Sequence, residues 1–451
     1  MSETRDNKIQ YVDQTIRDAQ QSLWGNMMTT EMILPIAATM DKVGYKAIGF
    51  SGGRAGTVAT RSLKENLFQR CRALSKIITS TPIRSSVSSW AAFSFAVEPA
   101  AANELWIKLM VSCGIRSFWF CHYQNLLERE RHLMKVMKAE GAEVVGGIMY
   151  TYSPVHTDEL WAKKTRLLMD SGLVDSIMME DAGGVLMPQH TPGLVKAIVG
   201  EARGVPVEFH SHCNLGMAPA VYAEAMRGGI RALHTAVAPM SNGTSLPGVE
   251  NTIKNARVLG LTHHLDMEAV KTVSEYFRKE AETRGMRLGV PQEYDLSLYT
   301  HQIPGGMMGT LRNQLAELKL SQRLDDVLAE AALVRKDLGY PVMATPYSQF
   351  VGAQALFNVT SGARYKVVSD EVSRYMLGHY GEPDGPVDQN VKDQILGSPK
   401  AKKWAAWKEP EVTVNDLRKL APTLSDEELM LKLSSPEGEF RDKLRALYGW
   451  M

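Results

Sequence analysis

The chain of 451 residues is long enough for two domains, or for one large barrel with a second domain attached. Hydrophobic residues make up 44% and charged residues 22% of it, which excludes disordered and collagen-like classes. Lysine and arginine number 51 against 50 aspartates and glutamates, so the chain lacks the basic excess of a nucleic-acid binder.

The cellular setting predicted from the sequence is cytoplasmic. The apolar segment 90–111 is interrupted by Glu98, Glu104 and Lys108, so no membrane insertion is expected. The N-terminus MSETRDNKIQ has no apolar core and predicts no secretory signal. The four cysteines form no CxxC pair, and a chain of this length needs no disulfides.

Short β-rich runs recur through the first 260 residues at roughly 30-residue spacing, which is typical of alternating strands and helices. The runs begin near residues 9, 45, 82, 115, 142, 174, 205 and 230. Amphipathic patterns lie between them, such as TDELWAKKTRLLMDSG at 157–172, which ends in a glycine typical of a helix C-terminus. Eight such units predict an α/β fold, a closed (β/α)8 TIM barrel. No glycine-rich dinucleotide turn follows the first strand, which argues against an open sheet.

The pattern changes to long amphipathic stretches from about residue 265. Gly/Pro-rich segments at 289–295 (GVPQEYD) and 301–309 (HQIPGGMMG) predict loops at the junction. We therefore expect a barrel domain over 1–290 and a mainly helical domain over 291–451 that completes the active-site cleft.

In a barrel, chemistry gathers where strands end and loops begin. The polar residues that follow or end the predicted strands are Arg17, Asp18, Gln21, His122, Glu180, Asp181, His210 and His212. Alternate residues of a strand point the same way, so both imidazoles of the HSH segment face one side. Two imidazoles and a facing carboxylate predict a divalent metal site with open positions. A pair of structural histidines bound to carboxylates is the alternative.

Several segments together resemble the motifs of the biotin-dependent carboxyltransferase family. This family includes the carboxyltransferase domain of pyruvate carboxylase, the oxaloacetate decarboxylase alpha subunit and the transcarboxylase 5S subunit. The segments are DQTIRDAQQSL at 13–23, HSHCNLGM at 210–217, APMSNGTSLP at 238–247, HQIPGGMMGTLRNQL at 301–315, ATPYSQFVGAQALFNV at 344–359 and HYGEPDGPVDQNV at 379–391. The resemblance thus extends over nearly the whole chain.

The resemblance implies a (β/α)8 barrel with a helical C-terminal domain, assembled as a homodimer. It also implies a divalent metal ion (zinc, manganese or cobalt) held by the residues that match the family's ligands, which are Asp18, His210 and His212. Such an ion polarises a carbonyl and stabilises an enolate, the intermediate shared by decarboxylation, carboxyl transfer and retro-aldol cleavage.

Further roles follow from the same resemblance. Arg17 and Gln21 match polar groups that line a 2-oxo acid pocket, and Thr345 matches a threonine that moves a proton between biotin and the pyruvate enol. The expected substrate is a small molecule with a carbonyl or carboxylate group. The chain has no A-M-K-M biotinylation motif, so any biotin is expected on a separate carrier protein.

The largest departure from the family is Glu180, which stands where the family has a carboxylated lysine that ligates the metal. Glutamate supplies a carboxylate without carbon dioxide, and carboxylate is a normal ligand for such metals. Glu180 is therefore expected to ligate directly or through a water, or to act as a catalytic base. A salt-bridging role outside the site is the alternative.

The substrate pocket departs from the family as well. Ser88 and Trp119 replace two arginines, and His122 replaces an aspartate and is a candidate catalytic residue. A bidentate arginine–carboxylate pair contributes about 1.5–3 kcal/mol, so the substrate is expected to be less anionic or bulkier than pyruvate. An aromatic or uncharged part of it would rest on Trp119, unless Arg54, Arg84 or His122 restores the charge.

Three functions remain open from the sequence. The first is a metal-dependent carboxyltransferase or decarboxylase that acts through an enolate of a 2-oxo acid. The second is a biotin-independent metal-dependent C–C lyase or hydrolase with a rewritten pocket. The third, a non-catalytic relative kept as a structural or regulatory subunit, is disfavoured because the candidate ligands are all present.

Overall fold

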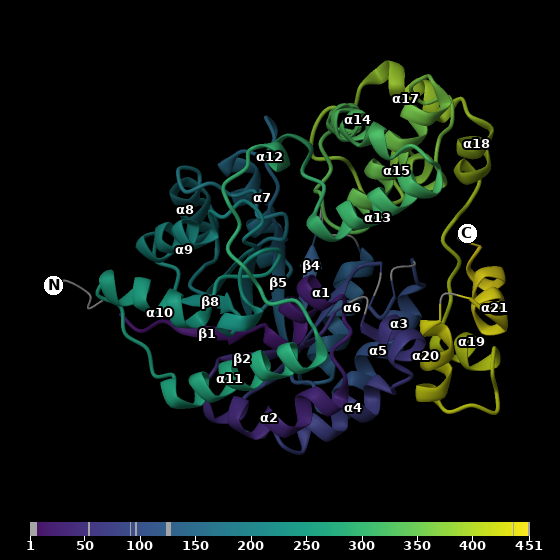
Figure 1. Ribbon diagram of the computed structural model, residues 1–451. Helices are drawn as coiled ribbons and strands as arrows, with labels where there is room; N and C mark the ends of the chain where they lie inside the picture. The colour runs from purple at the N-terminus through teal and green to yellow at the C-terminus, as the bar shows by residue number, and fades with distance from the viewer. Residues whose placement is uncertain are drawn as a thin grey trace.

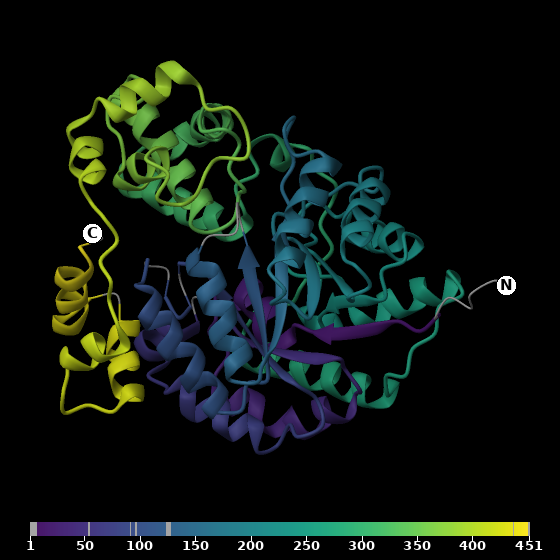
Figure 2. The same cartoon turned by 180° about the vertical axis from the view of Figure 1, so that it is seen from behind.

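The computed structural model describes residues 7–52, 55–90, 92–94, 97–122, 128–435 and 437–449. Its centre is a closed barrel of parallel strands in sequence order, in which β8 returns to pair with β1 (Figures 1 and 2). The strands are β1 (Gln10–Asp13), β2 (Ala47–Ser51), β3 (Ile83–Ser88), β4 (Ser117–His122), β5 (Glu143–Met149), β6 (Ser176–Asp181), β7 (Val207–Ser211) and β8 (Ala232–Thr235). All eight fall on the predicted β-rich runs, with β4 and β6 each ending one residue beyond, so the predicted TIM barrel is confirmed.

The strands are buried on both faces, as expected where helices cover the outside of a parallel sheet. Every residue of β2 and of β6 is buried. The helical elements of this part are η1 (Thr15–Ala19), α1 (Gln20–Trp24), α2 (Thr30–Lys42), α3 (Ala55–Val58), η2 (Ala59–Leu63), α4 (Leu67–Ser75), α5 (Ala100–Ser112), α6 (Glu128–Ala139), α7 (Asp158–Asp170), α8 (Thr191–Glu201), α9 (Ala218–Arg227), η3 (Ala238–Met240), α10 (Val249–Val258) and α11 (Met267–Arg284).

Helix α7 shows how the local sequence sets these elements. The Thr157 side chain accepts a hydrogen bond from the backbone N–H of Leu160 and caps the helix start. The helix presents Trp161 and Leu168 to the barrel and ends before Gly172, which has φ of 65°. The predicted helix at 157–172 is therefore confirmed.

The helices after the barrel form two groups with different partners. They are α12 (Ser297–His301), α13 (Gly305–Glu317), η4 (Ser321–Arg323), α14 (Leu324–Asp337), α15 (Tyr347–Ser361), α16 (Asp370–Met376), α17 (Gln389–Leu396), α18 (Pro399–Ala405), α19 (Val414–Lys419), α20 (Asp426–Ser434) and α21 (Glu439–Tyr448). Residues of α13–α17 share a hydrophobic cluster with Trp119, Met149 and Met178 near the carboxyl ends of the strands. Helices α19 and α20 instead pack beside α5, at the flank of the barrel (Figure 1).

The junction differs in one respect from the sequence-based expectation. Residues 301–309 were expected to form a loop, but α12 ends at His301 and α13 already begins at Gly305. Pro304 is the N-cap residue of α13 with φ of −61°, and the glycines that follow fall in the first turn. The division into domains at residue 290 stays a prediction.

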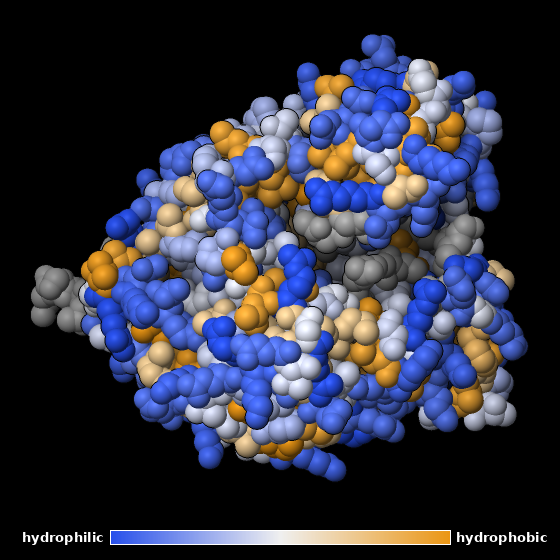
Figure 3. All heavy atoms as spheres, in the orientation of Figure 1, coloured by the Kyte–Doolittle hydropathy of each residue, from blue (hydrophilic) through white to orange (hydrophobic). Residues whose placement is uncertain are grey.

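The outer surface is mixed in character. On the face shown in Figure 3, hydrophilic side chains predominate and hydrophobic ones occur in scattered groups. Among the described residues, no helix combines the length and the apolar character required to cross a membrane.

Candidate active site

The first loop of the barrel is wound as a π-helix, η1, that carries two candidate residues. The Thr15 hydroxyl donates a hydrogen bond of 2.6 Å to Oδ1 of Asp13, which fixes the exit from β1. One turn of π-helix then brings Arg17 and Asp18 to the carboxyl end of the barrel, where both are buried. Such turns are frequent at functional sites.

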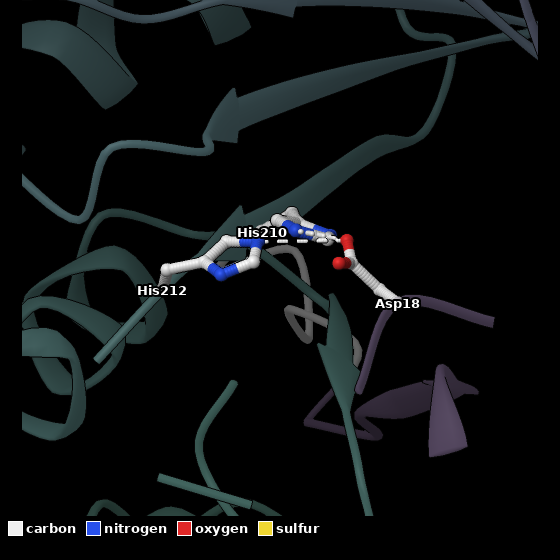
Figure 4. Close-up of side chains that lie close together, drawn as sticks. All are labelled: Asp18, His210 and His212. Carbon is white, nitrogen blue, oxygen red and sulfur yellow. Dashed lines mark ion pairs between the residues drawn. The ribbon is translucent and has the colours of Figure 1, made fainter. Parts of the chain in front are cut away.

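Asp18, His210 and His212 converge, as Figure 4 shows. Oδ2 of Asp18 lies 3.2 Å from Nε2 of His210 and 3.5 Å from Nε2 of His212. One ligand atom from each residue lies within 4.8 Å of the other two. Among the described residues this is the group that could hold a metal ion, and it consists of the three residues expected from the sequence.

The ring of His212 is held by the backbone. Its Nδ1 lies 2.7 Å from the carbonyl oxygen of Thr244 and donates to it, which leaves Nε2 facing Asp18. Nε2 of His210 is buried and makes no well-aligned hydrogen bond. A buried imidazole nitrogen without a hydrogen bond, next to a carboxylate, is suited to bind a cation.

Burial and charge set the protonation of these groups. Burial alone would raise the pKa of Asp18, but Arg17 and the two histidines hold that pKa well below its ordinary value. Burial lowers the pKa of His210 to about 3, in spite of Asp18. For His212, burial is outweighed by the Asp18 charge, and the pKa rises to about 9. Without a metal, His212 therefore carries a proton at neutral pH.

Glu180 is next to this group but not part of it. It pairs with His210 in the register of β6 and β7, so both side chains point to the same side of the barrel. Its Oε2 is buried without a hydrogen-bond partner among the described residues. Burial, opposed by Arg17 and reinforced by Asp18, raises the pKa of Glu180 to about 8.

Asp181, the other carboxylate at the end of β6, is satisfied locally. It accepts hydrogen bonds of 2.9 Å from the backbone N–H groups of Val185 and Leu186 and one of 2.8 Å from the Ser211 hydroxyl. Asp181 thus shapes the turn after β6.

Arg17 bridges Asp18 and the third strand. Its Nη1 forms an ion pair with Asp18 and its Nη2 donates to the Ser86 hydroxyl at 3.1 Å. A Cβ at Gly52 would lie 3.0 Å from Nη2, so glycine leaves room for the guanidinium. Nε of Arg17 is buried and has no hydrogen-bond partner among the described residues.

Two expectations about the pocket are wrong. Trp119 is only 1% exposed and Arg17 lies over its ring at 4.5 Å, so it offers no free face to a substrate. Arg84 does not restore charge to the site, because its guanidinium binds Glu208 and Glu143 near the amino ends of the strands. Arg54 lies outside the described residues.

The remaining candidates are Gln21, Thr345 and His122. Gln21 lies in α1, one turn after Asp18, and is partly exposed. Thr345 is half-buried and follows Ala344, which belongs to the same hydrophobic cluster as Trp119. The backbone of His122 ends β4, but its side chain lies outside the described part of the chain.

The sequence analysis missed two residues behind the site. His234 lies 3.1 Å from His210 (Nδ1 to Nδ1) and 2.8 Å from Glu208 (Nε2 to Oε2). Glu208 is two residues before His210 on β7, so its side chain points to the same side of the strand. The reasoning that grouped His210 with His212 could therefore have identified Glu208 as a neighbour of the site.

A cavity of about 290 Å³ adjoins the site. It is lined by the loop after β8, including Thr244, by the segment that contains Arg287 and Gln292, and by His301 of α12. Thr244 connects this cavity to the site, because its carbonyl oxygen holds the ring of His212, although none of the three converging side chains lines the cavity. Its volume is close to the range of small-molecule sites.

Two family descriptions match the chain. Residues 8–276 match the family described as HMGL-like, and residues 298–438 match the family described as "Conserved carboxylase domain". A pyruvate carboxylase subunit of Methanocaldococcus jannaschii is 35% identical over 86% of this chain and 68% of its own length. The methylmalonyl-CoA carboxyltransferase 5S subunit of Propionibacterium freudenreichii subsp. shermanii is 29% identical over 84% of this chain and 74% of its own.

The fold is also that of a solved relative. The carboxyl transferase domain from Rhizobium etli pyruvate carboxylase, determined with pyruvate and biocytin, superposes with a TM-score of 0.83. The match covers 98% of this chain and 78% of that one at 23% identity. Together with the matches along the sequence, this shows that the chain belongs to the biotin-dependent carboxyltransferase family of enzymes.

Proposed function

We propose that this protein transfers a carboxyl group between a 2-oxo acid and biotin, and that a divalent metal ion bound by Asp18, His210 and His212 assists the transfer. The convergence of these three donor atoms at the carboxyl end of the barrel carries the proposal. The relatives that are named as pyruvate carboxylase and 2-oxoglutarate carboxylase chains support a 2-oxo acid as the substrate.

The donor set suits zinc, manganese or cobalt, which accept imidazole and carboxylate together. A divalent cation in this position would act as a Lewis acid on the substrate carbonyl. The chain supplies the geometry: the Thr244 carbonyl orients His212, and Arg17 pairs with Asp18.

We assign Glu180 to the metal as a fourth protein ligand. A buried carboxylate without a partner is unfavourable, and a divalent cation would remove that penalty. The register of β6 and β7 directs Glu180 and His210 to the same side, which supports this assignment over a role outside the site. A base beside the metal is the alternative role, and loss of metal on substitution separates the two.

The remaining candidates bind substrate or move protons. The free Nε–H of Arg17 is a donor for the substrate carboxylate, with Gln21 alongside. Thr345 carries the proton between the enol and biotin, and its position next to the Trp119 cluster supports this. Thr345→Ser should retain this transfer, whereas Thr345→Ala should lose it. We keep His122 as a further candidate for acid–base chemistry.

The pocket supports a substrate other than pyruvate itself, because Ser88 and Trp119 stand where the family has arginines and Arg84 is engaged elsewhere. The biotin is proposed to arrive on a separate carrier protein. The pyruvate carboxylases of Methanocaldococcus jannaschii and Methanothermobacter thermautotrophicus support this, since the matching chain of each is named as one subunit of the enzyme. We further propose a homodimer, and a division of labour between a barrel over 1–290 and a helical domain over 291–451.

The test is a biotin-dependent decarboxylation assay. The purified protein, loaded in turn with zinc, manganese or cobalt, is given oxaloacetate or another β-carboxylated 2-oxo acid, with and without biotin. We expect decarboxylation that requires both metal and biotin. Decarboxylation or retro-aldol cleavage that ignores biotin would instead establish the biotin-independent lyase, and efficient use of oxaloacetate would show that the changed pocket still accepts the pyruvate skeleton.

A further inference from the structure

His234 lies on the far side of His210 from Asp18 and has no part in the function proposed above. It belongs to β8, beside β7, and its side chain is fully buried. One ring nitrogen faces His210 at 3.1 Å and the other faces Glu208 at 2.8 Å. His234 therefore connects a candidate metal ligand to a carboxylate buried inside the barrel.

The direction of the hydrogen bond to Glu208 follows from its other partners. Oε2 of Glu208 lies 2.6 Å from Nη1 of Arg84, and Oε1 pairs with Nζ of Lys46. A carboxylate held by two cations only accepts hydrogen bonds, so Nε2 of His234 must carry the proton.

The opposite nitrogen of His234 is then an acceptor. Two N–H donors converge on it, Nε2 of Gln14 and Nδ1 of His210, each at 3.1 Å. His210 is thus arranged to carry its proton on Nδ1 and to keep a lone pair on Nε2. That lone pair is directed at Oδ2 of Asp18, 3.2 Å away.

Packing keeps both rings in this arrangement. The Trp119 ring lies 5.3 Å from the ring of His210, at 54°, and 6.0 Å from that of His234, at 86°. The two imidazoles meet edge-on at 68° with a centroid separation of 5.2 Å. Both rings thus pack against the same buried tryptophan, which restricts their orientation.

We propose that His234 is a positioning residue, which accepts the Nδ1–H of His210 and so directs the Nε2 lone pair of His210 at the metal position. This inference rests on the proposed metal site. Partners that fix the tautomer of a metal-binding histidine commonly change metal affinity by about 10- to 100-fold when they are replaced.

A matched pair of variants tests the role. His234→Gln keeps a donor for Glu208 and an acceptor for His210, whereas His234→Met has a similar volume and offers neither. Cobalt(II) is titrated into the metal-free proteins, and its affinity and visible absorption are recorded, since that absorption depends on ligand geometry. We expect the affinity of His234→Met to fall by about 10- to 100-fold with an altered spectrum, and that of His234→Gln to stay near wild type.

The outcomes separate this inference from the proposed function. If wild type binds no cobalt, or Asp18→Asn binds it equally well, the metal site itself is wrong and this inference is overturned with it. If wild type binds cobalt at Asp18 and His234→Met binds it with the same affinity and spectrum, only the role of His234 is overturned. Equal weakening in the Gln and Met variants also overturns it, because packing alone would then be responsible. His234→Leu replaces the Met variant if that variant does not fold, as judged by circular dichroism.

Discussion

The two ends of the barrel interior hold their charges in opposite ways. Near the amino ends of the strands, Arg84 donates to Glu208 at 2.6 Å and to Glu143 at 3.1 Å, and Lys46 pairs with the same Glu208. Arg84 also donates to the Ser117 hydroxyl at 2.8 Å. Every charge in this cluster has partners of opposite sign.

At the carboxyl ends of the strands, by contrast, several buried polar atoms of the described residues are unpaired. Oε2 of Glu180, Nε2 of His210 and Nε of Arg17 are buried without hydrogen-bond partners among the described residues. Buried polar atoms without partners destabilise a fold unless a ligand binds to them. The charges at the amino ends therefore stabilise the fold by pairing with one another, whereas those at the carboxyl ends leave polar atoms available to a ligand.

The largest effect is expected from Asp18→Asn, which keeps the shape of the side chain and removes its charge. Both histidines face this carboxylate, so the variant should lose the metal and about a thousandfold in carboxyl transfer, the scale of a Lewis acid worth several kcal/mol. Metal content and turnover are measured together. Asp325→Asn, at an exposed carboxylate of α14, is the control, and an Asp18→Asn protein that keeps metal and turnover would contradict the assignment.

Arg84→Met should act on stability instead. It leaves Glu208 with fewer partners in a buried position, and breaking such a pair costs about 3 kcal/mol or more. Urea unfolding of the metal-free protein measures this directly. The control is Arg116→Met, an exposed arginine whose guanidinium donates to the carbonyls of Val111 and Ile115. Equal unfolding midpoints for the two variants would remove the structural half of the comparison.

The sequence predicts the barrel and part of the site at its carboxyl end, but not the contacts that surround that site. Eight β-rich runs with helical spacers determine the barrel, and the HSH alternation together with the first-loop Asp18 predicts the three converging side chains. These patterns are local periodicities, so they can be recognised in the sequence without knowledge of the fold. The amphipathic stretches after residue 265 predict helices equally well, yet they do not indicate that α19 and α20 pack beside α5.

What could not be predicted depends on closure of the barrel. Gln14 and His234 are separated by 220 positions and meet only because β1 pairs with β8. The burial of Trp119 beneath Arg17 likewise follows from the conformation of η1 and not from the sequence around either residue. Contacts of this kind need the register between strands as well as their existence.

Glu180→Gln should move activity and stability in opposite directions. Loss of a ligand or base is expected to lower turnover by about a hundredfold. In the folded metal-free protein burial raises the pKa of Glu180 to about 8, so wild-type stability falls as pH rises from the ordinary carboxyl range through 8. Glutamine avoids this loss, and the variant should resist urea better than wild type by at least about 1 kcal/mol at pH 9.

The control for that variant is Glu159→Gln, an exposed carboxylate in the first turn of α7. Because Glu159 is at the surface, its substitution should leave turnover unchanged. If Glu180→Gln keeps both the metal and the turnover of wild type, the glutamate has a structural role only. If it keeps the metal but loses turnover, Glu180 is the base and not a ligand.

The smallest and most diagnostic effect concerns pH. In the metal-free site Glu180 and His212 hold protons, with pKa values of about 8 and about 9, the second raised by the Asp18 charge in spite of burial. Both protons must leave for the groups to ligate, so metal affinity should rise with pH and level off above about 9. Each proton released contributes about a tenfold change per pH unit, and Glu180→Gln removes one of the two. A competition titration with a chelator measures both slopes. Parallel slopes for wild type and Glu180→Gln would place Glu180 outside the ligand set, while a slope one proton shallower in the variant would show that a carboxylate left unpaired in the fold is completed by the metal.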